Sequence, residues 1–490
     1  MKNVILICLI IILLPRINYA DNSIWGRLAN PGFENEPVKS TVFFSGNWRN
    51  GIQFYDYNPS NNTGLYTIHP FDSRHLGWSE NVSYREFAVN TLIDAGVNVI
   101  NMSYWGLPGT DNWAYWAPMQ TSTASHDELF DVVLGKDILI APFIESFAET
   151  ENYEGFSFYT DFPGTAINPS PVLITLIEDL IDRYLVNPDN TQWPSKWARV
   201  YDQDGQERYL VSIIHVASNQ GSVTNQSFAE GFDRVADKIF TNTGIHIGFA
   251  LDILPSDSYA PGSFKATAAG TGPYLAQQSS ILAIQCFIPE IWTGMSNEND
   301  LIAWKNTFHN GWINTGIPFI HDISPGYDAH IVFPSSPLYG NNQLWRDLQT
   351  QAIINFESNS FAFNVWNGYT EGFAGVPTLQ YGDTTYNWVC SLFGGTCGHT
   401  NIITENTSFE EKLELVPNPA TDYFELFLNE QDEQIICIKI VNYTGSIIHS
   451  QHIAENTKHV RFPTGTMPQG MYYIIVETNK NIYARKILLQ

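Results

Sequence analysis

The amino-acid sequence predicts an α/β fold, a (β/α)8 TIM barrel, followed by a small all-β sandwich domain. Between residues 40 and 400, short apolar segments alternate about eight times with amphipathic segments of helical period. The apolar segments are almost continuous, as expected for parallel strands that are covered on both faces. After residue 400 the pattern changes to short alternating strands separated by turn residues, which is typical of an antiparallel sandwich.

The elements of the predicted barrel follow from this alternation in chain order. Strands are expected at 41–47, 97–106, 137–146, 209–219, 245–254, 282–292, 317–328 and 360–372. The helices expected to follow them lie at 83–96, 125–136, 171–185, 228–242, 272–281, 298–313, 344–355 and 384–394. Eight such units fit a closed barrel better than a doubly wound sheet. No Gly-x-Gly-x-x-Gly turn follows the first strand and no phosphate-binding loop is present, so the usual nucleotide-binding fingerprints are missing.

The first 20 residues have the layout of a secretory signal peptide. Lys2 gives a positive start, an apolar run extends from Val4 to Leu14, and small residues precede Asp21. The apolar run is short for a membrane span, and the alternative interpretation is an uncleaved anchor. No later segment is long and apolar enough to span a bilayer, so we expect an exported chain with no membrane span in its mature form.

Composition limits the classes of partner. The chain has 50 acidic and 24 basic residues and a formal net charge of -26, which disfavours nucleic acid and anionic membranes as ligands. Aromatic residues make up 14% of the chain and suit the faces of sugar rings, although a large core also accounts for many of them. No spacing typical of a metal cluster and no Gly-x-Ser-x-Gly elbow is present, and nothing in the sequence requires a cofactor.

Five cysteines occur, of which Cys8 lies in the predicted signal peptide. Cys390 and Cys397 bracket a short loop and could pair after export. Cys286 and Cys437 lie in apolar strands and are expected to be free thiols.

The end of the chain carries a recognisable pattern. The segments are "LVPNPATDYFELFL", "IVNYTGSIIHSQ" and "MPQGMYYIIVETNKNIYARKILLQ". They resemble the type A C-terminal sorting domain of the type IX secretion system of Bacteroidota. The resemblance implies contact with that secretion machinery, passage through the outer membrane, and release or attachment at the cell surface. The alternative is an ordinary sandwich such as a sugar-binding module. We therefore expect a signal peptide at 1–20, the barrel at 21–400, a linker at 401–410 and the sorting domain at 411–490.

Polar and aromatic residues gather at the predicted strand ends, where (β/α)8 barrels place their active sites. They are Asn101, Tyr104, Trp105, Glu145, His215, Ser218, Asn219, Asp252, Glu290, Trp292, His321, Asp322, Asp328, Asn364, Trp366, Tyr369 and Glu371. Several acids interleaved with Trp and Tyr form the pattern that glycoside hydrolysis requires, because two carboxyl groups must flank the scissile bond. The aromatic rings would supply platforms for sugar rings.

Each of these residues also has a structural interpretation. An acid at a strand end often caps the next helix or binds loop amides, and Asp328 fits that role equally well. His215 lies in an apolar strand, where a core histidine is the commoner case. Glu290, after Pro289, is consistent with a solvated loop residue. A shift of two residues in a strand end would remove Glu145 or Asp252 from the mouth.

The segment "FNVWNGYTEG" at 363–372 resembles the eighth-strand motif of the glycoside hydrolase family 71 and 99 group, usually Asn-Glu-Trp-x-Glu-Gly. Further likenesses are "LIDAGVNVINMSYWG", "DILIAPFIES" and "GIPFIHDISPGYD", and the arrangement is closer still to an uncharacterised Bacteroidota family described as hydrolase-like, domain of unknown function 5010. Asn364 and Trp366 match the motif, and Glu371 matches its second Glu. Val365 stands where the first Glu is expected, so the paired-glutamate mechanism of family 99 does not transfer.

The resemblance implies a secreted glycoside hydrolase that acts on a polysaccharide, an α-linked glucan or mannan. Glu371 would be the general acid, with Asp252, Glu145 or Asp322, in that order, as its carboxylate partner. The residues expected to contact the sugar are Asn101, Tyr104, Trp105, Asn219, Glu290, Trp292, Asn364, Trp366 and Tyr369. Two alternatives stay open. One is a catalytically inactive glycan-binding barrel at the cell surface, and the other is an unrelated barrel enzyme such as an esterase with a metal held by His215 or His321.

Overall fold

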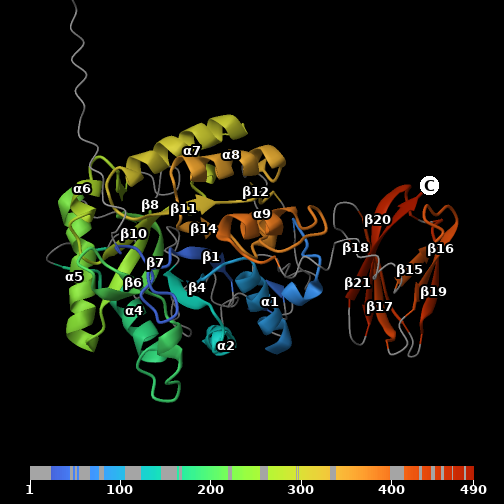
Figure 1. Cartoon of the computed structure of the whole chain (residues 1–490), viewed down its shortest axis with the longest axis horizontal. Helices are drawn as coiled ribbons and strands as arrows, with labels where there is room; N and C mark the ends of the chain where they lie inside the picture. The colour runs from blue at the N-terminus through green and yellow to red at the C-terminus, as the bar shows by residue number, and fades with distance from the viewer. Residues whose placement is uncertain are drawn as a thin grey trace, which may run out of the picture.

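The structure is a computed structural model of the whole chain (Figure 1). It describes residues 24–44, 48–49, 52–53, 67–76, 82–104, 123–144, 163–164, 168–218, 223–253, 263–293, 295, 297–330, 338–397, 413–429, 433–442, 447–453, 457–465, 467–478 and 482–490. The predicted signal peptide at 1–20 and the predicted linker at 401–410 lie outside the described residues, as does most of the long first connection after residue 44.

Eight parallel strands in the described part of the chain close into a barrel. They are β1 (Lys39–Phe43), β4 (Val99–Tyr104), β5 (Leu139–Ile144), β7 (Glu207–Ser218), β8 (Ile247–Ile253), β10 (Ile281–Gln285), β11 (Phe319–Ile323) and β14 (Phe361–Phe363). Each strand pairs with the next in chain order, and β14 returns to pair with β1. The predicted (β/α)8 barrel is confirmed.

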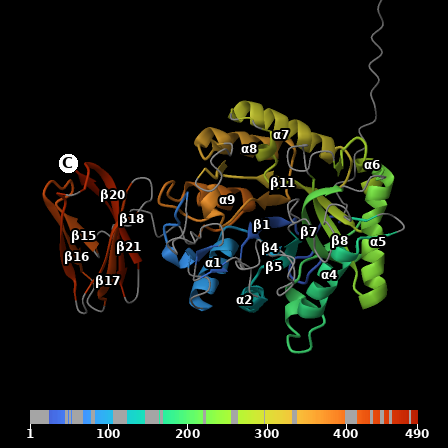
Figure 2. The same cartoon turned by 180° about the vertical axis from the view of Figure 1, so that it is seen from behind.

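Helices follow the strands and surround the barrel (Figures 1 and 2). They are α1 (Val82–Asp94), α2 (Thr123–Val133), α4 (Pro171–Tyr184), α5 (Asn225–Thr243), α6 (Gly272–Leu275), α7 (Glu298–Ile313), α8 (Gln343–Asn355) and α9 (Thr384–Phe393). The ends of α5 show why the segment is helical, because Thr224 and Ser227 form a capping box and Gly244 ends the helix in the left-handed conformation.

The fifth helix differs from the expectation at 272–281, since α6 has only four residues. The reason lies in the next strand, where the Ser280 carbonyl already accepts a barrel hydrogen bond from the Phe249 amide at 2.7 Å. The residues just before Ile281 therefore lead into β10 and do not continue the helix.

Shorter elements complete the barrel domain. They are β2 (Trp48–Arg49), β3 (Ile52–Gln53), η2 (Ser73–Leu76), η5 (Trp193–Lys196), β6 (Arg199–Tyr201), β9 (Phe264–Lys265), η6 (Pro289–Trp292), β12 (Gly326–Asp328), β13 (Leu338–Gly340) and η7 (Tyr369–Glu371). Several strands end earlier than the sequence predicts, among them the strand predicted at 317–328, which ends at Ile323. The strand predicted at 282–292 ends at Gln285, and the strand predicted at 360–372 ends at Phe363.

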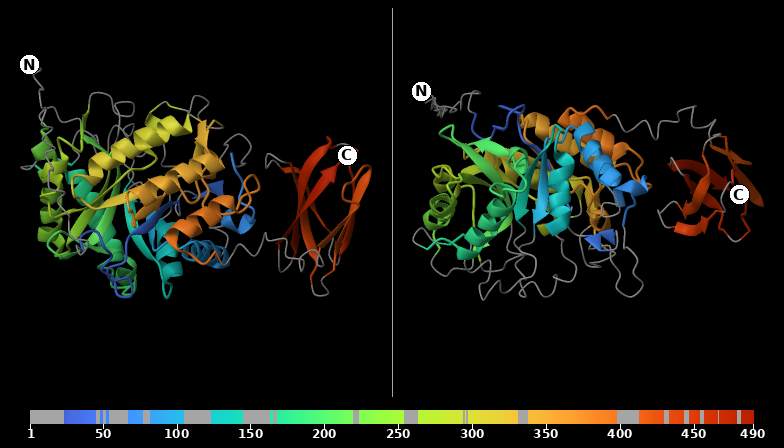
Figure 3. Two further views of the ribbon diagram at one scale, coloured as in Figure 1. Left: turned by 45° about the horizontal axis from the view of Figure 1, so that its top comes forward. Right: turned by 90° about the horizontal axis from the view of Figure 1, so that it is seen from below.

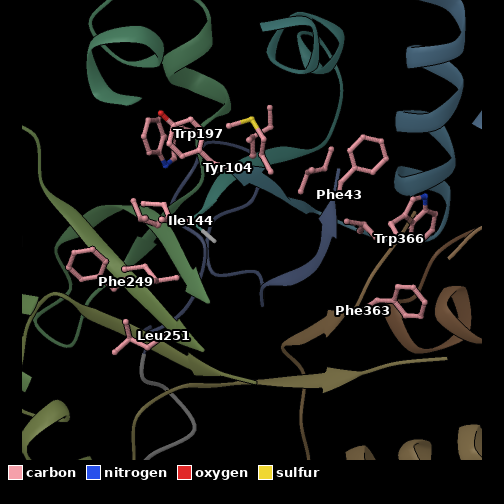
Figure 4. Close-up of a cluster of buried hydrophobic side chains, with 14 of the residues drawn as sticks. Phe43, Tyr104, Ile144, Trp197, Phe249, Leu251, Phe363 and Trp366 are labelled. Carbon is pink, nitrogen blue, oxygen red and sulfur yellow. The ribbon is translucent and has the colours of Figure 1, made fainter. Parts of the chain in front are cut away.

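The hydrophobic core of the barrel domain lies in two places, inside the ring of strands and between the strands and the surrounding helices. Outward-facing side chains pack between strands and helices, and Figure 4 labels Phe43, Tyr104, Ile144, Trp197, Phe249, Leu251, Phe363 and Trp366 in this layer. Inward-facing residues fill the barrel, with a lower cluster that includes Val99, Leu139, Leu210 and Ile320. An upper cluster near the carboxyl ends of the strands contains Val42, Phe44, Phe143, Ile214 and Phe373.

The described residues between 413 and 490 form an antiparallel sandwich. Its strands are β15 (Leu413–Val416), β16 (Tyr423–Leu428), β17 (Ile435–Asn442), β18 (Ile447–His452), β19 (His459–Pro463), β20 (Gly470–Thr478) and β21 (Ile482–Leu489). Sheets β15–β16–β19 and β18–β17–β20–β21 make up the sandwich (Figure 3). They enclose one core, which contains Phe424, Phe462, Ile438 and Ile474. The predicted small all-β domain is confirmed. Within the described residues, no helix has the length and apolar character that crossing a membrane requires.

Candidate active site

Asp252 lies on β8 with its side chain directed into the barrel, because its neighbours Leu251 and Ile253 pack outward. Its carboxylate accepts hydrogen bonds from the His215 amide at 2.8 Å, from the His215 ring Nδ1 at 3.0 Å and from the Phe287 amide at 2.6 Å. His215 has a φ of 53°, and the pairing of β7 with β8 is irregular at this point. Asp252 thus secures a bulge in β7 and the start of the connection after β10.

Asp322 lies at the corresponding end of β11 and is fully buried. Its Oδ2 accepts a hydrogen bond from the Lys305 ammonium at 2.6 Å, and the Lys305 side chain is itself only 1% exposed. Its Oδ1 accepts from the side-chain amide of Asn364 and, at 3.5 Å, from the amide of Ile288. The charge of Asp322 is therefore balanced inside the protein.

Together these contacts form a polar belt below the mouth, which we define as His215, Asp252, Lys305, Asp322 and Asn364. Asp252 and Asp322 bind the amides of two successive residues in the connection after β10, and Asn364 follows β14 directly. The belt thus joins strands β7, β8, β10, β11 and β14 at their carboxyl ends. Its hydrogen bonds to backbone amides fix the chain at the carboxyl ends of these strands, where the active site is expected.

Glu371 lies in η7, in the connection between β14 and α9. Its Oε1 accepts a hydrogen bond from the Tyr327 hydroxyl at 3.1 Å. Burial raises the pKa of the Glu371 carboxyl from its ordinary value to about 7, and the hydrogen bond from Tyr327 acts in the opposite direction. A carboxyl group with this pKa can donate a proton at neutral pH.

The local sequence explains why Glu371 is held there. Gly372 ends the turn with a φ of 78°, and a Cβ at this position would lie 3.0 Å from the Asp328 amide nitrogen. The close approach places η7 against β12, which carries Tyr327. Asp328 is the next residue of β12, so its side chain points away from that of Tyr327, and its Oδ1 contacts His330.

The aromatic residues expected to form sugar platforms divide into two groups. Tyr104, Trp366 and Tyr369 are at most 5% exposed and belong to the outer core. Tyr104 contacts His126 of α2, and Trp366 contacts Phe363 in Figure 4. Trp105 and the side chain of Trp292 lie outside the described residues.

The other predicted residues are placed as follows. Asn101 is buried inside the barrel, where the Ser212 hydroxyl donates to its side-chain oxygen at 3.4 Å. Glu145, Asn219 and the side chain of Glu290 lie outside the described residues. Among the described candidates, the structure therefore brings Asp252, Asp322 and Asn364 together in the belt, and it places Glu371 against Tyr327.

The two histidines considered as metal ligands lie on opposite faces of the barrel wall. His215 faces inward beside Phe287, whereas His321 faces outward and contacts His309 of α7 at 3.2 Å. In the part of the chain that the structure describes, no group of three or more His, Cys, Asp or Glu side chains is placed to hold a metal ion.

Sequence reasoning missed two residues that define the site, Lys305 and Tyr327. Lys305 shares the buried face of α7 with Leu301, Ile302 and Trp312. A lysine at that helical spacing was a readable signal of a buried partner. Tyr327 carried no comparable signal, because its contact with Glu371 depends on how β12 and η7 meet.

Comparison with known proteins identifies the tail. A family model described as a secretion system C-terminal sorting domain matches residues 414–490. The tail is such a sorting domain, and the protein is secreted or attached to the cell surface. No curated protein sequence matches the chain.

Several solved structures are similar to the chain. The GH99 endo-alpha-mannosidase from Bacteroides thetaiotaomicron has 15% identity and a TM-score of 0.46, over 72% of this chain and 97% of that one. A glycoside hydrolase-like protein has 13% identity and a TM-score of 0.46, over 73% and 94%. The endo-beta-1,4-mannanase from Thermotoga petrophila has 10% identity and a TM-score of 0.40, over 93% and 98%. At these values the likenesses carry no argument about activity, and the fold assignment rests on the strand pairing described above.

Proposed function

We propose that the protein is an exported glycoside hydrolase that cleaves an α-linked glucan or mannan, with Glu371 as the general acid. One observation carries the proposal: a carboxyl group with a pKa of about 7 lies at the carboxyl ends of the strands of a (β/α)8 barrel. Protonation of the leaving oxygen of a glycosidic bond needs an acid whose pKa is raised in this way. The hydrogen bond from Tyr327 fixes the orientation of the carboxyl group.

The second carboxylate of the proposed reaction is Glu145. Of the three candidate partners, Asp322 is neutralised by Lys305, and Asp252 uses both oxygens to bind backbone amides. Those two acids are better suited to positioning the mouth than to attacking a sugar or a water molecule. Glu145 follows Ile144 directly at the end of β5, and its side chain is outside the described residues.

The test is a screen for release of reducing sugar from α- and β-linked glucans and mannans. Glu371→Gln should lower kcat on the cleaved polymer by about 100- to 10,000-fold, which is the usual contribution of a general acid. Glu145→Gln should cause a comparable loss. The control is Asp237→Asn, because this carboxylate lies on α5 with its side chain 74% exposed. Activity that survives in Glu371→Gln would refute the assigned role.

A glycan-binding barrel without activity is the second candidate function. The observation that favours it is that, among the described residues, both acids of the belt are engaged by other groups. In that case no polymer would be cleaved, while one of them would still retard or sediment the protein. Binding that is unaffected by Glu371→Gln, without any release of reducing ends, would establish this alternative.

A further inference from the structure

The last helix of the barrel ends against the first helix. At the end of α1, the Asp94 carbonyl oxygen accepts hydrogen bonds from the Thr396 amide at 2.8 Å and from the Cys397 amide at 3.1 Å. The Cys390 sulfur, in the last turn of α9, lies 4.0 Å from the same oxygen. One carbonyl group therefore brings the two cysteines to the same point.

The backbone of residues 394–397 is tightly packed against the end of α1 and turns sharply. Gly395 passes so close to α1 that an added Cβ would lie 2.3 Å from the Asp94 oxygen. Gly394 and Cys397 both have positive φ values, 74° and 53°, so the chain turns sharply after α9 and returns toward Cys390. The two thiols lie within hydrogen-bonding reach of one another, and neither takes part in a disulfide in the structure.

We propose that Cys390 and Cys397 form a disulfide bond once the protein has been exported. Two observations support the proposal independently: the Cys390 sulfur and the Cys397 amide meet at the Asp94 carbonyl, and the chain carries a secretion sorting domain. Oxidising compartments outside the cytoplasm are where such bonds form and persist. The inference does not depend on the proposed hydrolase activity.

The electrons pass to a protein disulfide that serves as the oxidant. The Cys397 thiolate attacks one sulfur of the oxidant and forms a mixed disulfide, which releases one thiolate of the oxidant. The Cys390 thiolate then attacks the Cys397 sulfur, which forms the bond between the two residues and releases the second thiolate. The oxidant leaves as a dithiol, having gained the two electrons and two protons that the cysteines lose.

The difference in burial between the two cysteines determines which thiol reacts first. Cys390 is buried, and burial raises the pKa of its thiol above the usual range. Cys397 is partly exposed and is accessible to an oxidising protein. The more accessible thiol therefore reacts first, and the buried one completes the bond.

The disulfide bond would stabilise the region in which β14 pairs with β1 and closes the barrel. In this region, Lys39 of β1 donates a hydrogen bond to the Phe393 carbonyl at 2.6 Å, and Phe393 stacks on Phe361 of β14. In the sequence, Cys397 comes shortly before the segment that leads to the sorting domain. A disulfide at this position would keep the end of α9 attached when that segment is pulled or cut.

The test uses the full chain exported by a bacterial host. The protein is denatured, alkylated without a reductant and digested with chymotrypsin, which cleaves after Phe393 between the two cysteines. The fragments that carry Cys390 and Cys397 should be recovered joined and unalkylated, and dithiothreitol should separate them. Alkylation of Cys286 and Cys437 in the same sample shows that the reagent reached the thiols. Separate alkylated fragments, or a bond from either cysteine to another residue, would overturn the proposal.

Thermal unfolding gives a second measurement. Cys397→Ser and Cys390→Ala should each lower the Tm of the barrel by about 3–5 °C, as expected for loss of a short-loop disulfide. The double variant should lose no more than the single ones, and a reductant should bring the parent to the same Tm. Equal Tm values for parent and variants without a reductant would contradict a stabilising disulfide. Cys437→Ala, in the sandwich, is the matched control and should leave the barrel transition unchanged.

Discussion

Each carboxyl group near the mouth has different neighbours. Asp322 forms an ion pair with Lys305, and Asp252 receives hydrogen bonds from two backbone amides and an imidazole nitrogen. Glu371 has a neutral tyrosine hydroxyl as its hydrogen-bond donor, and partial removal from water raises the pKa of its carboxyl group. The chemical roles of the three acids therefore differ, since among them only Glu371 has a neutral hydroxyl as its hydrogen-bond donor.

The variant Tyr327→Phe tests how the hydrogen bond from Tyr327 affects the pKa of Glu371. The hydroxyl stabilises the carboxylate, so its removal should raise the pKa of Glu371 further. If Glu371 is the general acid, the alkaline limb of the profile of kcat/KM against pH should move to higher pH. The measurement is that profile for parent and variant on the polymer found in the screen. A limb that moves to lower pH would contradict the assigned contact.

Lys305→Met tests the charge balance of the belt. The variant leaves the Asp322 carboxylate buried without a cation, so we expect a loss of about 3–5 kcal/mol in the free energy of unfolding. The double variant Lys305→Met, Asp322→Asn removes both charges and should be less destabilised than Lys305→Met alone. Chemical denaturation of the parent, both single variants and the double variant measures the effect. A double variant as unstable as the sum of its parts would show that the two side chains act independently.

The connection between β14 and α9 is the element that carries the proposed acid, and Gly372 sets its path. Gly372→Ala should cost about 1–2 kcal/mol from the left-handed backbone alone. It should also displace Glu371, because the new methyl group would press on the Asp328 amide. Gly382→Ala is the matched control in the same connection, since Gly382 also has a positive φ but has no atom within 4 Å of an added Cβ. A loss of activity in both variants would point to backbone strain and not to displacement of η7.

Strands and helices were predictable where burial imposes a period, and their ends were not. The barrel followed from near-continuous apolar strands, whereas the lengths of α6 and β10 depend on the Ser280 carbonyl, which pairs across the sheet. The acids of the belt looked like catalytic groups because sequence places them at strand ends. Their actual partners include the amides of Phe287 and Ile288 and the ammonium of Lys305, which lie on other elements. Such contacts are set by tertiary packing and leave no period in the sequence.

At the scale of the whole molecule, the layer between barrel and helices contains buried histidines. His126 of α2 contacts the Ser103 carbonyl, while His309 of α7 and His321 of β11 contact one another. Burial lowers the pKa of all three, to about 4 for His126 and about 3 for His321. The Asp127 carboxylate opposes the shift of His126, and the Lys305 cation reinforces those of the other two. These groups couple the stability of the whole barrel to pH.

The sign of the coupling follows from proton uptake. An unfolded chain protonates its histidines as the pH falls through about 6.5, whereas the folded barrel keeps these three neutral until much lower pH. Stability is therefore lost progressively below pH 6.5, and His126 alone accounts for about 3 kcal/mol by pH 4. His126→Asn should flatten the dependence of the Tm on pH between 6.5 and 4, because one proton acceptor of the unfolded chain is gone. His452→Asn, at an exposed position of the sandwich, should leave the barrel's profile unchanged. A profile as steep in His126→Asn as in the parent would mean that other groups, such as the carboxylates, carry the acid sensitivity.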